Sequence, residues 1–575
     1  MEDLYYELWG QPLPVNKNYE VQVPVANYGL RPGYKIGMKL SRVGTFVPPE
    51  FRSKREKKVF TMMEVTAYLP CGVQKLLVRP QYDALRHKLI RAENTRWLGA
   101  GKSLIPAVRG KLDYEISGQP GTGKTFFLSY LLVCRLCARL PTVYRKDDQR
   151  FYLFDRASPG LEITLKQLSD LPPTQKRRLW VLTDEKIDDT HWYPKTLPWF
   201  VVLAASPNKT TASEQWHKER NPAKFYMSIW GWPEIFAAYC LEVSVYPTQD
   251  EINKLFTTFE CLGPVPRTCF QTIIVSNDDE YNESLETYLS EIDRAIQKFI
   301  LEGGRETIEQ ELHANSSHKI TIMQPSKSGF SFTPRLITRW IAFRVYETAL
   351  RHSQLESFRL YKNLSQQTNL RSAAGWFLES YVHEWFLFGG KFEADEMPVV
   401  NTMATPLVLN AVRAEKGLPE YFQTPEDLRC KVKGLNGRGI NHAVLKKYFL
   451  PWSRNYPSID GLLFQDPKTI VFFQITLAAQ HEIKSPGVAV LLNTLPKTIK
   501  NVYFVFVVPE HCADHYSKAQ LIPDSAAISP SMRTKLNVKQ FRLVFREKEM
   551  QAVAVRGYRG GYDSEVEVFD DEDSD

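Results

Sequence analysis

Residues 114–125, YEISGQPGTGKT, decide the fold of the first half of the chain. The segment opens with a short apolar run typical of a buried strand, and its glycine-rich part fits the pattern G-x-x-x-x-G-K-[ST] in full. The next residues, FFLSYLLVCRL, are apolar and predict a helix. In such a strand, loop and helix, backbone N–H groups and the helix N-terminus surround phosphate groups. The alternative is a glycine-rich turn without a ligand. We predict a site for ATP or GTP with Mg²⁺, formed by Gly118, Gln119, Pro120, Gly121, Thr122, Gly123, Lys124 and Thr125.

A second part of this site is expected at a strand that ends in acidic residues. We expect Lys124 to reach the β- and γ-phosphates and Thr125 to hold Mg²⁺. The run LWVLTDE (residues 179–185) places Asp184 and Glu185 at the C-terminal end of a predicted strand. Asp184 is then positioned to bind Mg²⁺ through water, and Glu185 is positioned to polarise the attacking water.

Two further segments are candidates for contact with the γ-phosphate. The apolar run WFVVLAASPN (residues 199–208) ends in Ser206 and Asn208, and strand ends at this edge of the sheet face the nucleotide. Arg267 follows the turn GPVP and precedes a helical region, where an arginine can couple hydrolysis to movement of a lid. A surface arginine beside a proline turn is the alternative for Arg267.

The order of predicted elements indicates an α/β multidomain protein. Apolar runs alternate with helical stretches around the phosphate loop, and this alternation argues for a parallel sheet flanked by helices. The aromatic motif IWGWPEI is expected to place Trp230 and Trp232 in the core. Over the 575 residues we predict an N-terminal leader region (1–105), a P-loop NTPase core (106–275), a helical lid (276–365), a mixed α/β domain (366–550) and a disordered acidic tail (551–575).

Charge points to nucleic acid, and DNA first, as a partner. The formal net charge is +8, but residues 563–575 hold eight acids and no base, so the preceding residues carry 73 bases, 57 acids and a net of +16. The alternative to a nucleic-acid partner is a generic basic surface. The stretch 51–60, FRSKREKKVF, is a nuclear localisation signal, a nucleic-acid contact or a solvated turn. A homo-oligomer is a further alternative, because a catalytic arginine contributed by another subunit cannot be identified from the sequence.

No membrane partner and no secretory signal are expected. The longest apolar runs have about seven residues, whereas a membrane-spanning helix needs about 20. The first residues, MEDLYYELWGQPLP, lack the apolar stretch of a signal peptide. Eight cysteines in 575 residues are too few for a disulfide scaffold and favour reduced thiols inside a cell.

The C-terminal domain carries a candidate nuclease site. The segment 458–476, SIDGLLFQDPKTIVFFQIT, predicts a hairpin in which Asp460 lies opposite Gln474. The helix WFLESYVHEWF (residues 376–386) carries Glu379 and His383 on one face, and His481 and Lys484 follow the second strand. One large class of nuclease holds Mg²⁺ against the scissile phosphate with an acid on one strand and an acid-x-lysine sequence on the strand opposite.

The sequence departs from that nuclease pattern at two positions. Gln474 stands where a second acid is expected, and Thr476 stands where the lysine is expected. Glu379, Asp460 and Gln474 are the candidate metal ligands, and His481 or Lys484 could stabilise the phosphate charge from shifted positions. Three interpretations stay open, namely an active nuclease, a nuclease-like domain that binds without cutting, and an unrelated structural hairpin.

These motifs together resemble the Crinkler/RHS-type family, which comprises fungal and oomycete Crinkler effectors and trypanosomal retrotransposon hot spot proteins. The resemblance rests on LYYELWGQPLP, LLVRPQYDAL, GQPGTGKTFFLSYLL, LAASP, IWGWPEI, GPVPR, AAGWFLESYVHEWFLFGGKF and the SID…FQIT…HEIK segment. It implies an AAA/STAND-type P-loop NTPase with a helical lid, joined to a restriction-endonuclease-like domain. It also implies a nuclear location, reached in some members by secretion and delivery into a host cell.

Overall fold

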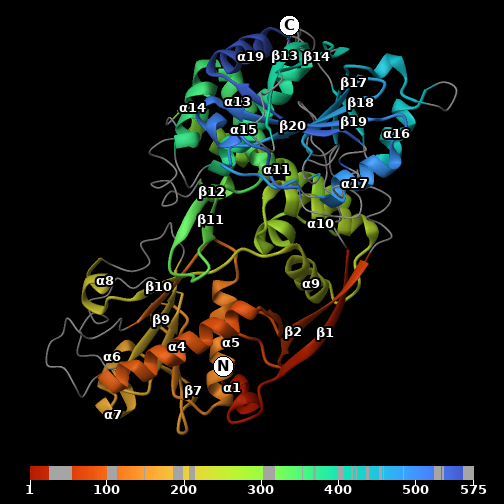
Figure 1. The fold of residues 1–575 in the computed structure, drawn as a ribbon. Coiled ribbons are helices and arrows are strands. Elements are labelled where there is room, and N and C mark those ends of the chain that lie inside the picture. Colours follow the sequence, from red (N-terminus) through yellow and green to blue (C-terminus); the bar gives the residue numbers. More distant parts are fainter. Residues whose placement is uncertain are drawn as a thin grey trace, which may run out of the picture. The chain divides into compact units, whose positions relative to one another are not determined.

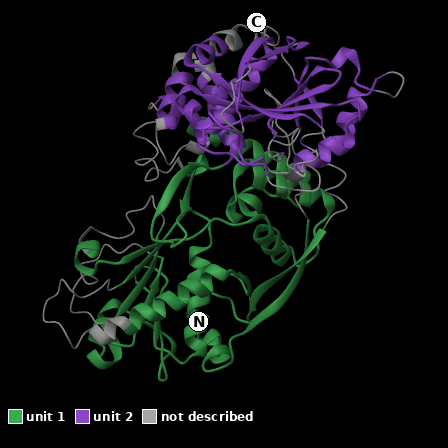
Figure 2. Cartoon of the chain, viewed as in Figure 1, with its two compact units in different colours: residues 1–24, 55–295, 306–337 green, residues 25–54, 296–305, 338–575 purple. Residues whose placement is uncertain are grey.

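The computed structural model describes residues 1–24, 55–99, 113–147, 149–184, 199–205, 214–301, 317–352, 354–366, 371–398, 406–415, 419–422, 424–434, 439–451, 456, 459–483, 485–522, 533 and 536–560. The chain forms two compact units (Figure 2). The first comprises residues 1–24, 55–295 and 306–337, so residues of the expected leader region belong to the same unit as the phosphate loop. The second comprises residues 25–54, 296–305 and 338–575.

A seven-stranded sheet forms the centre of the first unit (Figure 1). Its strands in spatial order are β10 (Ala223–Tyr226), β4 (Tyr114–Ser117), β9 (Phe200–Ala204), β8 (Trp180–Thr183), β5 (Thr142–Arg145), β6 (Phe151–Phe154) and β7 (Pro159–Ile163). The strands from β10 to β5 are parallel to one another, whereas β6 and β7 extend the sheet as an antiparallel hairpin. The predicted parallel sheet is therefore present, and β9 lies between the strand before the phosphate loop and β8, which Asp184 directly follows.

Both faces of this sheet are covered, which explains why its central strands β8 and β9 are almost entirely apolar. One face packs on α5 (Lys124–Cys137), α4 (Pro80–Gly99) and α1 (Glu2–Leu8) through a single buried cluster. The other face packs on α6 (Leu165–Asp170) and α8 (Glu214–Arg220). The short helix α7 (Pro173–Lys176) follows α6. Continuous apolar runs are typical of strands buried on both faces.

The rest of the first unit surrounds the phosphate-loop end of the sheet. An antiparallel sheet contains β1 (Val15–Pro24), β2 (Arg55–Glu64) and β3 (Lys75–Val78), so the described part of the basic stretch 51–60 lies on a strand. The helical part contains α9 (Trp232–Val243), α10 (Gln249–Leu262), the π-helical turn η3 (Arg267–Thr272) and α11 (Asp278–Leu301). The turn η4 (Ser317–Lys319) then leads into an antiparallel hairpin of β11 (Thr321–Pro325) and β12 (Phe332–Leu336), inside a region expected to be helical.

The second unit is a mixed α/β fold around an eight-stranded sheet. The spatial order is β14 (Pro406–Ala411), β13 (Gly390–Glu396), β20 (Val538–Phe545), β19 (Asn501–Pro509), β18 (Thr469–Ile475), β17 (Gly461–Asp466), β16 (Tyr448–Pro451) and β15 (Glu420–Phe422). Its helices are α13 (Arg339–His352), α14 (Gln354–Gln366), α15 (Arg371–Leu387), α16 (Pro425–Val432), α17 (Ser485–Thr494) and α19 (Glu547–Gly560), with short turns η7 (His442–Val444) and η8 (Glu510–Tyr516). Helix α19 covers part of the expected tail, and residues 561–575 lie outside the described residues.

Candidate nucleotide-binding site

The phosphate loop joins β4 to α5 as the sequence predicts. Strand β4 ends at Ser117, α5 begins at Lys124, and Gly121 and Gly123 have positive φ values of 82° and 91°. At Gly123 a Cβ atom would lie 2.5 Å from the Tyr82 hydroxyl oxygen, and at Gly121 it would lie 2.6 Å from the Arg267 Cβ. Glycine is therefore required at both positions by conformation and by space.

Lys124 is buried within the loop, although it carries the charge expected to bind phosphate. Its Nζ donates to the carbonyl oxygens of Gly118 (2.8 Å) and Gln119 (3.0 Å). Burial, and secondly the positive charge of Arg267, lowers the pKa of Lys124 from 10.5 to about 7. A lysine in this environment gains strongly from an anion, since the anion would offset the desolvation of its charged form.

Thr125 and Asp184 lie together, as a Mg²⁺ site at this position requires. The Thr125 hydroxyl donates to the Asp184 carboxylate at 2.9 Å, and Asp184 directly follows β8. Mg²⁺ in nucleotide sites is commonly held by one or two protein oxygens together with phosphate oxygens and water. Among the described residues there is no group of three or more His, Cys, Asp or Glu side chains that could hold a metal alone. The pair thus suits a metal that arrives with phosphate.

Aromatic side chains fix the shape of the loop from the outside. Tyr82 of α4 donates its hydroxyl to the Gly123 carbonyl at 2.8 Å, and the Trp230 indole N–H donates to the Thr122 carbonyl at 2.9 Å. Trp230 is itself covered by the guanidinium of Arg79, which forms an ion pair with Glu234. Trp230 is buried as expected, and it also supports the loop directly.

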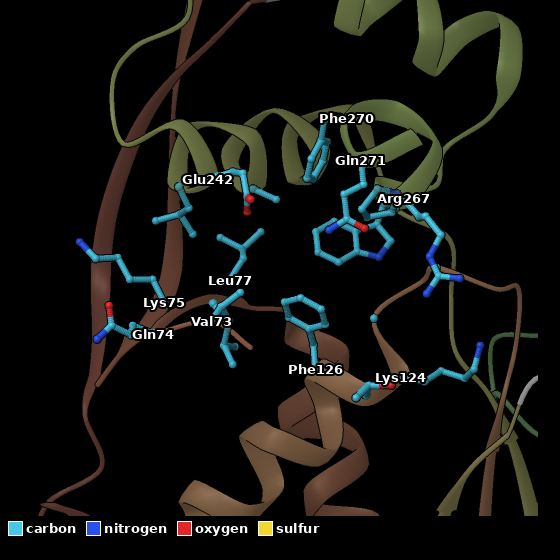
Figure 3. Close-up of a pocket in the computed structure, with 18 of the residues that line it drawn as sticks. Val73, Gln74, Lys75, Leu77, Lys124, Phe126, Glu242, Arg267, Phe270 and Gln271 are labelled. Carbon is cyan, nitrogen blue, oxygen red and sulfur yellow. The ribbon is translucent and has the colours of Figure 1, made fainter. Parts of the chain in front are cut away.

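A cavity of about 540 Å³ opens beside the phosphate loop (Figure 3). Phe126 enters it from α5 and Phe270 enters it from η3, while Leu77 and Leu241 add further apolar surface. Its polar lining includes Gln74, Lys75, Glu242 and Gln271. The volume and the mixture of apolar walls with a few polar groups are those of a small-molecule site.

Arg267 lies at the end of the cavity nearest the phosphate loop. It is exposed, lines the cavity together with Lys124, and extends from η3 toward the loop in Figure 3. Its positive charge is the second cause, after burial, that lowers the pKa of Lys124. Of the other predicted residues, Glu185, Ser206 and Asn208 lie outside the described residues.

The candidate nuclease residues come together only in part. The register of β17 and β18 places Gly461 opposite Phe473, as predicted, and a bulge at Gln465 shifts the pairing at the turn. The Asp460 carboxylate accepts hydrogen bonds from the Gln474 side-chain amide (2.6 Å) and from the Ile475 backbone N–H (2.7 Å). Burial raises the pKa of Asp460, which disfavours the charged form that a metal would need.

Glu379 contacts two residues whose charges also act on Asp460, since Arg339 and His383 lower the pKa of Asp460 against the larger effect of burial. Its carboxylate forms an ion pair with Arg339, and the ring nitrogen Nε2 of His383 lies 3.4 Å from its second oxygen. The other ring nitrogen of His383 lies 2.9 Å from the Tyr448 hydroxyl. His481 binds Gln520 through its backbone N–H, and Lys484 lies outside the described residues.

Comparison with known proteins adds little to this picture. No family model and no curated protein matches the chain. A RuvB mutant from Thermotoga maritima matches 47% of this chain and 93% of its own length, at 11% sequence identity and a TM-score of 0.27. AMPPCP-bound DnaA from Aquifex aeolicus matches 52% of this chain and 89% of its own length, at 12% identity and a TM-score of 0.24. At these TM-scores neither match bears on fold or function.

Several residues around the site were not foreseen from the sequence. Tyr82 and Phe126 lie within segments that carry the family resemblance but had no assigned role, Phe270 lies in no motif, and Gln74 and Lys75 belong to the expected leader region. Only the position of Phe126, directly after the G-K-T triplet, signals that it lies beside a bound nucleotide. None of the helices in the described part of the chain is long and apolar enough to cross a membrane.

Proposed function

We propose that the first unit binds a nucleoside triphosphate with Mg²⁺ and hydrolyses it. The observation that carries this proposal is the meeting of the Thr125 hydroxyl and the Asp184 carboxylate at 2.9 Å, beside a buried lysine in a glycine-rich loop. In this proposal the Lys124 ammonium leaves the carbonyls of Gly118 and Gln119 and contacts the β- and γ-phosphates. Thr125 and Asp184 hold Mg²⁺, which when bound neutralises charge on phosphate oxygens.

The remaining roles follow from position. Arg267 adds a second cation beside Lys124, and we assign it to the γ-phosphate. From their places in the sequence alone, Glu185 is assigned to polarise the attacking water, and Ser206 or Asn208 to sense the γ-phosphate. The nucleoside occupies the cavity between Phe126 and Phe270, whose size and apolar walls suit a base and a sugar. Either ATP or GTP is compatible with this lining.

Titration of the purified chain with a fluorescent ATP or GTP analogue at millimolar Mg²⁺ tests the proposal. Lys124→Ala should abolish binding and hydrolysis, because no other described side chain takes its place in the loop. Lys166→Ala, an exposed lysine on α6, is the matched control and should bind as the wild type does. Absence of any binding by the wild-type protein would refute the proposal.

For the second unit we propose binding of nucleic acid without cleavage, as part of a nucleotide-dependent switch. The contacts of Glu379 with Arg339 and of Asp460 with Gln474 and Ile475 favour this choice over an active nuclease, because both carboxylates already have partners. An active nuclease should nick plasmid DNA with Mg²⁺ or Mn²⁺, and Asp460→Ala should abolish the nicking. Hydrolysis stimulated several-fold by DNA, with strand displacement and no cutting, would instead indicate a translocating ATPase.

The resemblance to Crinkler/RHS-type proteins, a nuclear location, delivery into a host cell and homo-oligomerisation remain proposals. The net of +16 on the residues before the acidic segment 563–575 supports DNA as the partner. DNA affinity should then fall steeply with salt and rise when residues 563–575 are deleted. Unchanged affinity after the deletion would reject competition by the acidic segment.

A further inference from the structure

The side chain of Gln119 connects the phosphate loop to the hairpin that ends the first unit. Its Nε2 donates to the carbonyls of His318 (2.9 Å) and Thr321 (3.0 Å), and its Oε1 accepts from the Met323 N–H (3.3 Å). The residue is 3% exposed, so these three bonds form out of water. A buried amide with all these partners is costly to displace, because each group left behind would lose its hydrogen bond.

The backbone of the same residue contacts the lysine expected to bind phosphate. The Gln119 carbonyl accepts from the Lys124 Nζ at 3.0 Å and from the Thr122 hydroxyl at 2.8 Å. Gln119 therefore touches the ligand-binding lysine with its main chain and the η4–β11 segment with its side chain. A change in the position of Lys124 alters the surroundings of Gln119 at once.

The hairpin and η4 also contact α4, β10 and α11, through Lys88 with Ser328, Tyr226 with Phe332, and Glu291 with Lys319. At its tip the Gly329 carbonyl accepts from the Tyr226 N–H at 2.7 Å. At the base of the hairpin Ile337 fills the space beside Gly263, because a Cβ atom on Gly263 would lie 2.5 Å from the Cδ1 of Ile337. Gly263 begins the turn that leads to Arg267. Burial, followed by the charges of Lys319 and Arg267, lowers the pKa of His318 in η4.

The hairpin leads directly into the second unit along the chain. Strand β12 ends at Leu336, and α13 begins at Arg339, the residue paired with Glu379. Two residues, 337 and 338, separate the hairpin from this helix. This chain connection requires no particular arrangement of the two units in space.

We propose that Gln119 is a positioning residue that couples occupancy of the phosphate loop to the β11–β12 hairpin. This inference rests on the proposed nucleotide site. The two states differ in Lys124, whose Nζ lies on the carbonyls of Gly118 and Gln119 in the empty loop and, in this proposal, on phosphate in the filled one. In the filled loop, backbone N–H groups would bind phosphate and hold the loop backbone in place of the Lys124 bonds, and a fixed backbone would hold the Gln119 amide against η4 and β11. By thermodynamic linkage, the hairpin and the nucleotide stabilise each other by the same factor.

Hydrogen exchange of the full chain, with and without saturating AMPPNP and Mg²⁺, tests this coupling. In the wild type the nucleotide should slow exchange in residues 317–337 by about fivefold to tenfold, the effect of one or two buried hydrogen bonds. Gln119→Met keeps the side-chain volume and removes all three bonds. The variant should still bind AMPPNP, with an affinity reduced by a similar factor, and should lose the slowing.

Two controls separate coupling from a merely structural role. Gln249→Met removes an amide that donates to Asn253 in α10 and should leave the slowing intact. Gln119→Glu retains the acceptor for Met323 but places a carboxylate oxygen against the carbonyls of His318 and Thr321, so it should also lose the slowing. A structural role alone would change exchange equally with and without nucleotide.

The possible failures are distinguishable. If the wild type binds no AMPPNP, the proposed function is wrong. If it binds AMPPNP but exchange in residues 317–337 stays the same, only the coupling is wrong. The coupling is also overturned if Gln119→Met retains the full slowing. The wild-type comparison requires no variant, so a folding defect in Gln119→Met does not prevent a refutation.

Discussion

Nucleotide binding should take up a proton at slightly alkaline pH, because Lys124 is largely neutral in the empty site. Burial, with a smaller contribution from Arg267, places its pKa at about 7. A triphosphate beside the ammonium group favours the charged form and returns the pKa toward its ordinary value. Binding at a pH between these two values therefore protonates the lysine.

The size of the effect follows from the two pKa values. With a pKa of about 7 in the empty protein, binding at pH 8 should take up about 0.9 proton. The charged fraction of the empty site falls about twentyfold between pH 7.5 and 9, so the affinity should fall by the same factor. The terminal phosphate contributes little in this range, since phosphate monoesters ionise near pH 6.

Isothermal titration calorimetry at pH 8 measures this uptake directly, in two buffers that differ in ionisation enthalpy. Arg267→Gln should reduce the uptake, because removing one cation raises the pKa of Lys124 while burial keeps it low. A lysine with the ordinary pKa of 10.5 is charged over this whole pH range, so binding would add almost no proton to it. An uptake below about 0.2 proton would therefore refute the reasoning, and so would an affinity that stays constant from pH 7.5 to 9.

The same shift determines how the stability of the empty protein depends on pH. Between about pH 7 and 10.5 the unfolded chain binds more protons at Lys124 than the folded chain does. The free energy of unfolding should therefore rise with pH across this window, and the cost of burying the charge is fully present below it. Lys124→Met should remove this contribution, as urea titrations at pH 7 and 9 can show.

Three further changes test the site and its support. Asp184→Asn should reduce hydrolysis about a hundredfold without lowering the melting temperature, because it weakens only the Mg²⁺ site. A phosphate-release assay measures the rate of hydrolysis, and an unchanged rate would argue against the site. Gly123→Ala should lower the free energy of unfolding by about 2 kcal/mol, because φ at this position is 91° and the added Cβ would contact the Tyr82 hydroxyl. Adding Tyr82→Phe to this variant should restore part of the loss, as urea titrations can measure. An unchanged urea midpoint in Gly123→Ala would contradict the loop geometry. Arg220→Met should cost about 3–5 kcal/mol, since Asp113 would stay buried without its ion pair, and a loss below 1 kcal/mol would show that the pair is dispensable.

Short-range patterns predicted the parts of the structure that depend on neighbouring residues. The strand, loop and helix around Lys124 are formed by consecutive residues, and their glycines and apolar runs specify them locally. The pairing of Gly461 with Phe473 could be predicted because a short turn sets the register of a hairpin. The bulge at Gln465 could not be predicted, since it changes the pairing only at the turn and leaves the register of the apolar residues unchanged.

Contacts between segments far apart in the chain could not be predicted from the sequence. Gln119 reaches the η4–β11 segment about 200 positions later in the sequence, and no periodicity relates the two. The cavity includes Gln74 and Lys75, which composition alone assigned to a separate leader region. Side-chain periodicity shows that a face is buried, but it does not identify the segment that covers it.

The balance of charge explains why the two units are assigned different roles. At the phosphate loop two cationic side chains, Lys124 and Arg267, act on one space, and the burial of Lys124 is offset only by neutral carbonyls. That arrangement becomes more favourable when an anion enters. In the second unit the Glu379 carboxylate is already paired with Arg339, and burial favours the neutral form of Asp460. A metal there would have to displace an ion pair and ionise a buried acid, so that site gains much less from its expected ligand than the phosphate loop gains from a triphosphate.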